Sequence, residues 1–147
     1  MSSDDYKGRV ILVYWLPAAL WAALVLSVSG DAFSTAHSAD WIGELIIRVV
    51  GHPLPPRQFD LLHFLVRKTA HLTGYFIAGA LFFRAVRAGA AGWQRRWAMS
   101  AVALAAALAI LDEWHQFFVP SRGGTPWDVM IDVAGAAIAQ LVARFRG

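Results

Sequence analysis

Four long apolar stretches constrain this chain more than any other feature of its sequence. They lie near residues 10–28, 61–83, 97–118 and 127–143. Each reaches the roughly 17 to 25 residues that an apolar helix needs to cross the hydrocarbon core of a bilayer. Backbone groups in lipid must form their hydrogen bonds within the same segment, so we expect these stretches to be helices. The sequence therefore predicts an all-α, polytopic membrane protein, with four transmembrane helices in a single domain over residues 1–147.

The composition argues against a soluble domain and against several kinds of function. Hydrophobic residues make up 58% of the chain, the mean hydropathy is +0.50, and seven of the 147 residues are tryptophan. Cysteine is absent, which excludes a disulfide framework and a thiol nucleophile. The net charge is +3, but the basic residues flank apolar stretches and form no continuous stripe. Nucleic acid is therefore not an expected partner.

The first apolar stretch has some features of a secretory signal. Lys7 precedes it, and Ser29 and other small residues follow it. Its apolar run is longer than the 7 to 15 residues of a signal core, and Trp15 and Pro17 are unusual in such a core. We therefore expect the segment to be retained as the first span.

The basic residues beside the predicted spans give an orientation. Those on one side are Lys7, Arg9, Arg84, Arg87, Arg95, Arg96, Arg144 and Arg146. Membrane insertion tends to leave lysine and arginine near helix ends in the cytoplasm. Both termini are therefore expected to be cytoplasmic, in a multi-pass arrangement.

The connection between the first two spans, residues 29–60, contains an amphipathic pattern. Its apolar residues are Trp41, Ile42, Leu45, Ile46 and Val49, and its opposite face carries Asp40, Glu44 and Arg48. This spacing predicts a short interfacial helix on the outer leaflet, although packing across the mouth of the helix bundle would give the same pattern. Prolines 53, 55 and 56 then predict an extended passage into the second span.

Polar and charged side chains interrupt three of the predicted spans. The second contains Arg67, Lys68, His71 and Tyr75, the third contains Asp112, Glu113, His115 and Gln116, and the fourth contains Asp128 and Asp132. A charged residue at the centre of a spanning helix costs about 2.5 to 3.5 kcal/mol on insertion scales. Such residues usually persist where opposite charges, water or a polar ligand meet them. Oppositely charged helices therefore suggest one shared site.

Helical spacing puts these residues at matching depths and on common faces. Arg67 lies roughly 10 Å along the second helix from Asp60, and Asp112 lies roughly 10 Å from the outer end of the third. The expected stripes are Arg67, His71 and Tyr75 with Lys68 beside them; Asp112, His115 and Gln116 with Glu113 alongside; and Asp128, Asp132, Gly135 or Ala136, and Ala139. The small residues of the last stripe favour close helix packing. We expect one polar pocket beneath the extracytoplasmic surface.

The order of these residues resembles the VanZ-like integral membrane proteins. The matching elements are Arg67-Lys68-x-x-His71-x-x-x-Tyr75, Asp112-Glu113-x-x-Gln116, Pro120-x-Arg122, and Asp128 with Asp132 and Gly135. The family is named for a protein that confers low-level resistance to teicoplanin, a glycopeptide. The resemblance implies a cell-envelope protein of the bacterial cytoplasmic (inner) membrane. In such proteins the position of Asp132 often carries an amide.

The polar residues suit an anionic lipid, or a lipid-linked envelope precursor, whose headgroup lies just inside the outer leaflet. The predicted substrate-binding residues are Arg67, Lys68, His71, Tyr75, Asp112, Glu113, Gln116, Arg122, Asp128 and Asp132. The two arginines offer forked donors to phosphate or carboxylate, and Lys68 offers a point charge. The carboxylates would orient these cations and accept hydrogen bonds from sugar hydroxyls or amines.

Two other functions are compatible with the same residues. The run Ser121-Arg122, five residues, Asp128, three residues, Asp132 is similar in spacing to a motif of type 2 phosphatidic acid phosphatases, with Asp128 in place of their histidine. If the protein is an enzyme, we expect phosphoryl chemistry on a lipid, with His71 as nucleophile or base and Asp112 or Glu113 orienting its ring. In the other alternative, the charges form ion pairs that only hold a membrane scaffold together.

The sequence favours neither a metal site nor a transport path. None of the short zinc-ligand spacings is present, and the neighbouring arginine and lysine would repel a cation. We therefore expect no metal and no cofactor. The apolar run 101–109 and the apolar end of the second span leave no evident polar path through the cytoplasmic half. No segment marks an oligomer interface.

Overall fold

The computed structural model is all-α, as predicted, and it describes residues 3–28, 35–118 and 126–146. Within these ranges the helices are α1 (Ser3–Val10), η1 (Ile11–Trp15), α2 (Leu16–Val28), α3 (Thr35–Val50), α4 (Pro56–Arg87), α5 (Arg95–Phe117) and α6 (Pro126–Arg146). α1, η1 and α2 follow one another without a break, and η1 is a single π-helical insertion. The described residues contain no strand.

Among the described residues, two helical segments are long and apolar enough to cross a membrane. They are Lys7–Val28, with a mean hydropathy of 2.1, and Arg95–Phe117, with a mean hydropathy of 1.4. α4 and α6 correspond to the other two predicted spans, and both carry several charged side chains. The four-span arrangement therefore stays a prediction.

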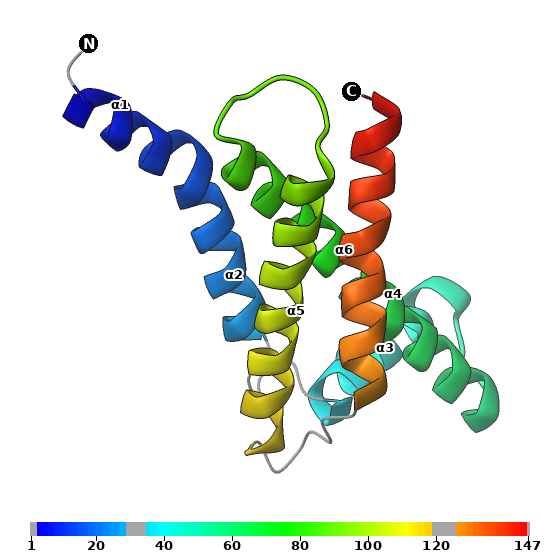
Figure 1. Cartoon of the computed structure of the whole chain (residues 1–147). Coiled ribbons are helices and arrows are strands. Elements are labelled where there is room, and N and C mark those ends of the chain that lie inside the picture. The colour runs from blue at the N-terminus through cyan, green and yellow to red at the C-terminus, as the bar shows by residue number, and fades with distance from the viewer. Residues whose placement is uncertain (1–2, 29–34, 119–125, 147) are drawn as a thin grey trace.

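α4 is longer than the sequence predicted. It begins at Pro56, where a start near residue 61 was expected, because the fixed φ of proline suits the first turn of a helix. The extended passage after α3 consequently ends at Pro55. With 32 residues, α4 is roughly 48 Å long, which exceeds the roughly 30 Å of a hydrocarbon core. Figure 1 shows it running obliquely behind α5 and α6.

α4 packs most extensively against α6, and glycine makes this contact close. An added Cβ on Gly79 would lie 2.8 Å from the Cα of Ala136, and one on Gly135 would collide with the backbone of Leu72. Alanines line the adjoining face of α5, where Ala101, Ala105 and Ala109 are fully buried. Backbones that approach this closely bring the polar stripes of the helices within reach of one another.

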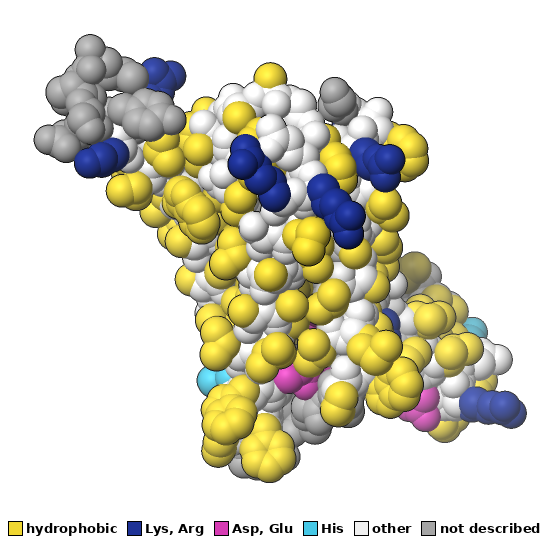
Figure 2. Space-filling model, in the orientation of Figure 1, with side chains coloured by type: hydrophobic (Ala, Val, Ile, Leu, Met, Phe, Trp, Pro, Cys, Tyr) yellow, Lys and Arg dark blue, Asp and Glu magenta, His cyan; other side chains and the backbone are white. Residues whose placement is uncertain are grey.

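Both termini and the connection 88–94 lie at one end of the helix bundle (Figure 1). Most of the lysine and arginine side chains visible in Figure 2 are at this end. Arginines at this end lie over aromatic rings; for example, Arg84 is 5.5 Å from the ring of Tyr14, and Arg144 is 5.4 Å from the ring of Trp93. The cytoplasmic-termini prediction requires this clustering, although the compartment itself stays a prediction.

α3 is the amphipathic helix expected between the first two spans. Glu44 and Arg48 form an exposed ion pair at 3.6 Å on its polar face. On another face, the hydroxyl of Ser38 lies 3.0 Å from a ring nitrogen of His63 on α4. His63 is 8% exposed, so this contact is buried between α3 and α4. The placement of α3 on the outer leaflet stays a prediction.

Large hydrophobic side chains cover the middle of the molecular surface (Figure 2). Strongly exposed examples are Leu12 in η1, Leu20 in α2, Phe64 on α4, Ile110 on α5 and Leu141 on α6. Soluble monomers rarely expose contiguous apolar patches beyond a few hundred Å². A surface of this kind suits a lipid environment.

Candidate functional site

The polar residues of α4 point in two directions, toward a cavity and toward α6. Arg67, His71 and Tyr75 face a cavity, as their common stripe predicts. Lys68 turns instead toward α6 and forms an ion pair with Asp128. The lysine is partly exposed and the aspartate is buried, so the charge of Asp128 is compensated within the protein.

His71 lies against α6. Its Nδ1 atom is 3.2 Å from Oδ1 of Asp132. Asp132 has no exposed surface, and its second oxygen, Oδ2, has no hydrogen-bond partner among the described residues. We had expected Asp112 or Glu113 to orient the His71 ring, and the structure assigns this contact to Asp132.

Asp112 connects α4 and α5. The hydroxyl of Tyr75 donates to Oδ2 of Asp112 at 3.4 Å, and the side-chain amide of Gln116 donates to the same oxygen at 3.3 Å. All three side chains are at most 2% exposed. Oδ1 of Asp112 has no hydrogen-bond partner within the described part of the chain.

Three polar groups from three helices therefore converge. One ligand-type atom each from His71, Asp112 and Asp132 lies within 4.8 Å of the other two. Two carboxylates this close in a buried environment repel each other unless a proton or a cation lies between them.

The other residues predicted from the third span and the loop after it differ in burial. Glu113 is buried beside Asp112, at 9% exposed. His115 is exposed, so our placement of it on the polar face with Asp112 and Gln116 was wrong. The buried face of α5 is centred between Asp112 and Glu113. His115, three positions after Asp112, therefore lies at the edge of this face. Pro120, Ser121 and Arg122 lie outside the described residues.

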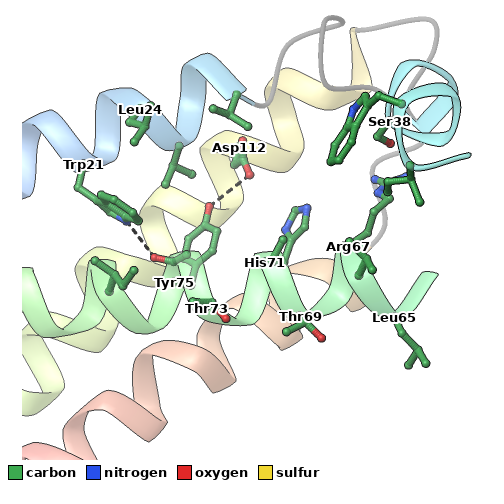
Figure 3. A pocket seen from close by; sticks show the side chains of 18 residues that line it. Trp21, Leu24, Ser38, Leu65, Arg67, Thr69, His71, Thr73, Tyr75 and Asp112 are labelled. Carbon is green, nitrogen blue, oxygen red and sulfur yellow. Dashed lines mark hydrogen bonds between the residues drawn. The ribbon is translucent and has the colours of Figure 1, made fainter. Parts of the chain in front are cut away.

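A cavity of about 790 Å³ adjoins this cluster, between α2, α3, α4 and α5. Its polar lining includes Arg67, His71, Tyr75 and Asp112, and apolar side chains such as Leu24, Val25, Val28, Ile42 and Leu65 form most of the rest. Figure 3 shows His71 and Tyr75 projecting from α4 toward Asp112, with Arg67 nearer to Ser38 on α3. The cavity is therefore mainly apolar, with a few polar side chains in its lining.

Sequence reasoning missed the contribution of α2 to this cavity and left open whether α3 packs across the helix bundle. The indole nitrogen of Trp21 donates to the carbonyl oxygen of Gly74 at 2.9 Å and fixes α2 against α4. Trp41 and Ile42 of α3 also line the cavity. The spacing of Trp21, Val25 and Val28 marks one helix face, but a face toward a cavity and a face toward lipid have the same pattern.

Comparison with known proteins agrees with the resemblance noted in the sequence. A family model described as VanZ/LLP1 matches residues 13–146. The chain belongs to the VanZ/LLP1 family. No curated protein and no solved structure matches it. Membership of the VanZ/LLP1 family fits a cell-envelope membrane protein.

Several of the residues that carried the VanZ resemblance meet in the structure. His71, Tyr75, Asp112 and Gln116 belong to one set of contacts, which Asp132 joins through His71.

Proposed function

We propose that this VanZ/LLP1-family protein binds an anionic membrane lipid or a lipid-linked envelope precursor in the cavity between α2, α3, α4 and α5. The observation that carries the proposal is a cavity whose walls are mainly apolar and which a few polar side chains, Arg67 among them, also line. A lipid has matching parts, since its chain is apolar and its headgroup is charged. The volume of about 790 Å³ lies within the usual range for small-molecule sites.

Charge favours an anionic headgroup. Of the described residues that line the cavity, Arg67 is the only lysine or arginine, because Lys68 is paired with Asp128. A guanidinium matches phosphate with two parallel hydrogen bonds, and such charge-assisted bonds are about twice as strong as neutral ones. Arg67 would hold the phosphate or carboxylate, while His71 and Tyr75 lie one and two helical turns deeper.

The proposal includes an orientation. With the basic end in the cytoplasm and α4, α5, α6 and the α1–α2 run crossing the membrane, the polar cluster lies in the outer half. Arg84 is 13 positions beyond His71 on α4, which is roughly 20 Å along the helix. A lipid-linked cell-wall precursor reaches the outer leaflet, and its recognition would account for a glycopeptide-resistance phenotype.

The contact between His71 and Asp132 favours a second candidate, hydrolysis of a lipid phosphate. Asp132 holds Nδ1, so Nε2 is the nitrogen through which His71 would act as a general base. It would accept a proton from water as the water oxygen bonds to phosphorus. The bond from phosphorus to the lipid oxygen would then break, and that oxygen would take up a proton.

A binding assay with purified protein tests the first proposal. The probes are a polyprenyl monophosphate, phosphatidylglycerol and the neutral phosphatidylcholine, each titrated into detergent-solubilised protein. We expect the anionic lipids to bind, and Arg67→Ala to weaken binding by roughly 10- to 100-fold, the value of a charge-assisted hydrogen bond. Arg95→Ala, at the basic end of the bundle, is the matched control and should bind normally.

The outcomes separate the three functions. Binding without release of inorganic phosphate supports recognition, and release of phosphate that His71→Ala abolishes supports hydrolysis. Equal binding of neutral and anionic lipids, or full binding by Arg67→Ala, would contradict the proposal. Loss of folded protein in every cluster variant, with no lipid bound by the wild type, would favour a scaffold.

A further inference from the structure

His71, Asp112 and Asp132 have the geometry of an incomplete metal-binding site. Their candidate ligand atoms lie within 4.8 Å of one another. Ligands that surround one zinc ion tetrahedrally at about 2.0 to 2.2 Å are roughly 3.4 Å apart. The three candidate ligand atoms therefore need to move only slightly closer together to share one ion.

The burial of the two carboxylates gives an independent reason for a cation. Asp112 is 2% exposed and Asp132 is 0% exposed, and each has one oxygen with no hydrogen-bond partner in the described part of the chain. A buried polar atom without a partner is costly, and a buried charge is costlier still. One divalent ion between the carboxylates would satisfy both oxygens and remove their mutual repulsion.

The neighbouring groups leave the required oxygens available. Tyr75 and Gln116 both donate to Oδ2 of Asp112, which orients the carboxylate and leaves Oδ1 for a metal. Oδ2 of Asp132 has no hydrogen-bond partner among the described residues either, so it is also available to a metal ion. Hydrogen bonds that orient ligands from outside are a regular feature of protein metal sites.

The structure weakens the two sequence arguments against a metal, and of the two basic residues only Arg67 still lines the cavity. The ligands come from α4, α5 and α6, so no short spacing in the sequence would reveal them. Lys68 is neutralised by Asp128, so it does not oppose a cation as the sequence suggested.

We propose that His71, Asp112 and Asp132 bind one divalent transition-metal ion of the zinc or manganese type. An imidazole with two carboxylates suits these ions, whereas calcium takes six to eight oxygen ligands. Three protein ligands leave a coordination position open, and His71 and Asp112 both line the cavity. A phosphate oxygen of the lipid takes this position, a part of the inference that rests on the proposed function.

Metal uptake without lipid tests the site itself. Tag-free protein in detergent is treated with a chelator, desalted, and titrated with Zn²⁺ or Mn²⁺ alone, with bound metal measured by mass spectrometry. We expect one ion per chain and a rise in the melting temperature. His71→Ala and Asp132→Asn should lower the affinity by at least about tenfold, the loss that even outer partners of metal ligands produce.

The chain offers a control for each variant. His115→Ala removes an exposed histidine from α5, and Asp60→Asn removes an exposed carboxylate from α4, and both should bind metal like the wild type. If the cluster variants do not fold, the metal-dependent shift in the melting temperature of the wild type still tests whether the protein binds metal. No uptake and no shift in the wild type, or equal loss in the controls, would overturn the proposal.

Lipid binding with and without chelator separates this inference from the proposed function. Metal uptake together with lipid binding that weakens in chelator supports both. Metal uptake with lipid binding that chelator does not change overturns the lipid-bridging role and leaves lipid recognition standing. Metal uptake with no lipid binding in any condition supports the metal site and contradicts the proposed function.

Discussion

Nδ1 of His71 lies 3.2 Å from Oδ1 of Asp132, although 61 positions separate the two residues in the chain. The contact depends on the crossing of α4 and α6. Gly135, three positions after Asp132, lies against the backbone of Leu72, the residue after His71. A side chain at Gly135 would push the helices apart, so the glycine that permits the crossing also positions the polar pair.

The α4–α6 crossing should be sensitive to a single methyl group. In Gly79→Ala the new Cβ would lie 2.8 Å from the Cα of Ala136 and 2.9 Å from its carbonyl oxygen, so the helices must separate. We expect a loss of about 1 to 3 kcal/mol in the free energy of unfolding, as for other overpacked sites. Gly74→Ala is the control, since its added Cβ would meet no atom of another helix within 4 Å. Scanning fluorimetry in detergent would measure both, and equal melting temperatures would contradict the close crossing.

Lys68 and Asp128 should behave as a coupled pair. Lys68→Met leaves the buried carboxylate without its cation, and Asp128→Asn leaves the ammonium without its counterion. Each change should lower the free energy of unfolding by at least about 1 kcal/mol, because an uncompensated charge remains. The double variant should lose less than the sum of the two. Additive losses in a denaturant titration would show that the ion pair contributes nothing.

Filling the apolar part of the cavity should select against long lipid chains. Ala70 lines the cavity on α4, so Ala70→Phe reduces the space for a chain and leaves Arg67 in place. We expect weaker binding of a long-chain polyprenyl phosphate, by roughly tenfold, and little change for a short-chain analogue, since binding strength follows buried apolar area. Ala80→Phe places the same side chain on an exposed position of α4. An equal effect of both variants would argue against a chain-binding cavity.

The membrane orientation can be tested cleanly because the chain contains no cysteine. Ala90→Cys labels the basic end of the bundle, and Gln58→Cys labels the opposite end near the start of α4; both positions are exposed. A membrane-impermeant maleimide applied to intact spheroplasts should modify Gln58→Cys only, and inverted vesicles should reverse the result. Labelling of both positions from one side would rule out the four-span arrangement.

The sequence by itself determined the all-α class, the approximate position of each long helix, and the small-residue stripe of α6 in which Asp132, Ala136 and Ala139 are buried. These features follow from local periodicity, because side chains three or four positions apart share a helix face. The sequence also indicated that polar groups on three helices belong together, since a charge in an apolar helix requires a partner.

Only the tertiary structure decided which groups meet. Whether His71 contacts Asp132 or Asp112, whether Lys68 faces the cavity or Asp128, and whether Trp21 faces lipid depend on how far each helix is rotated and where the helices cross. Rotation and crossing result from packing between segments distant in the chain, notably at Gly79 and Gly135, and no local pattern contains them.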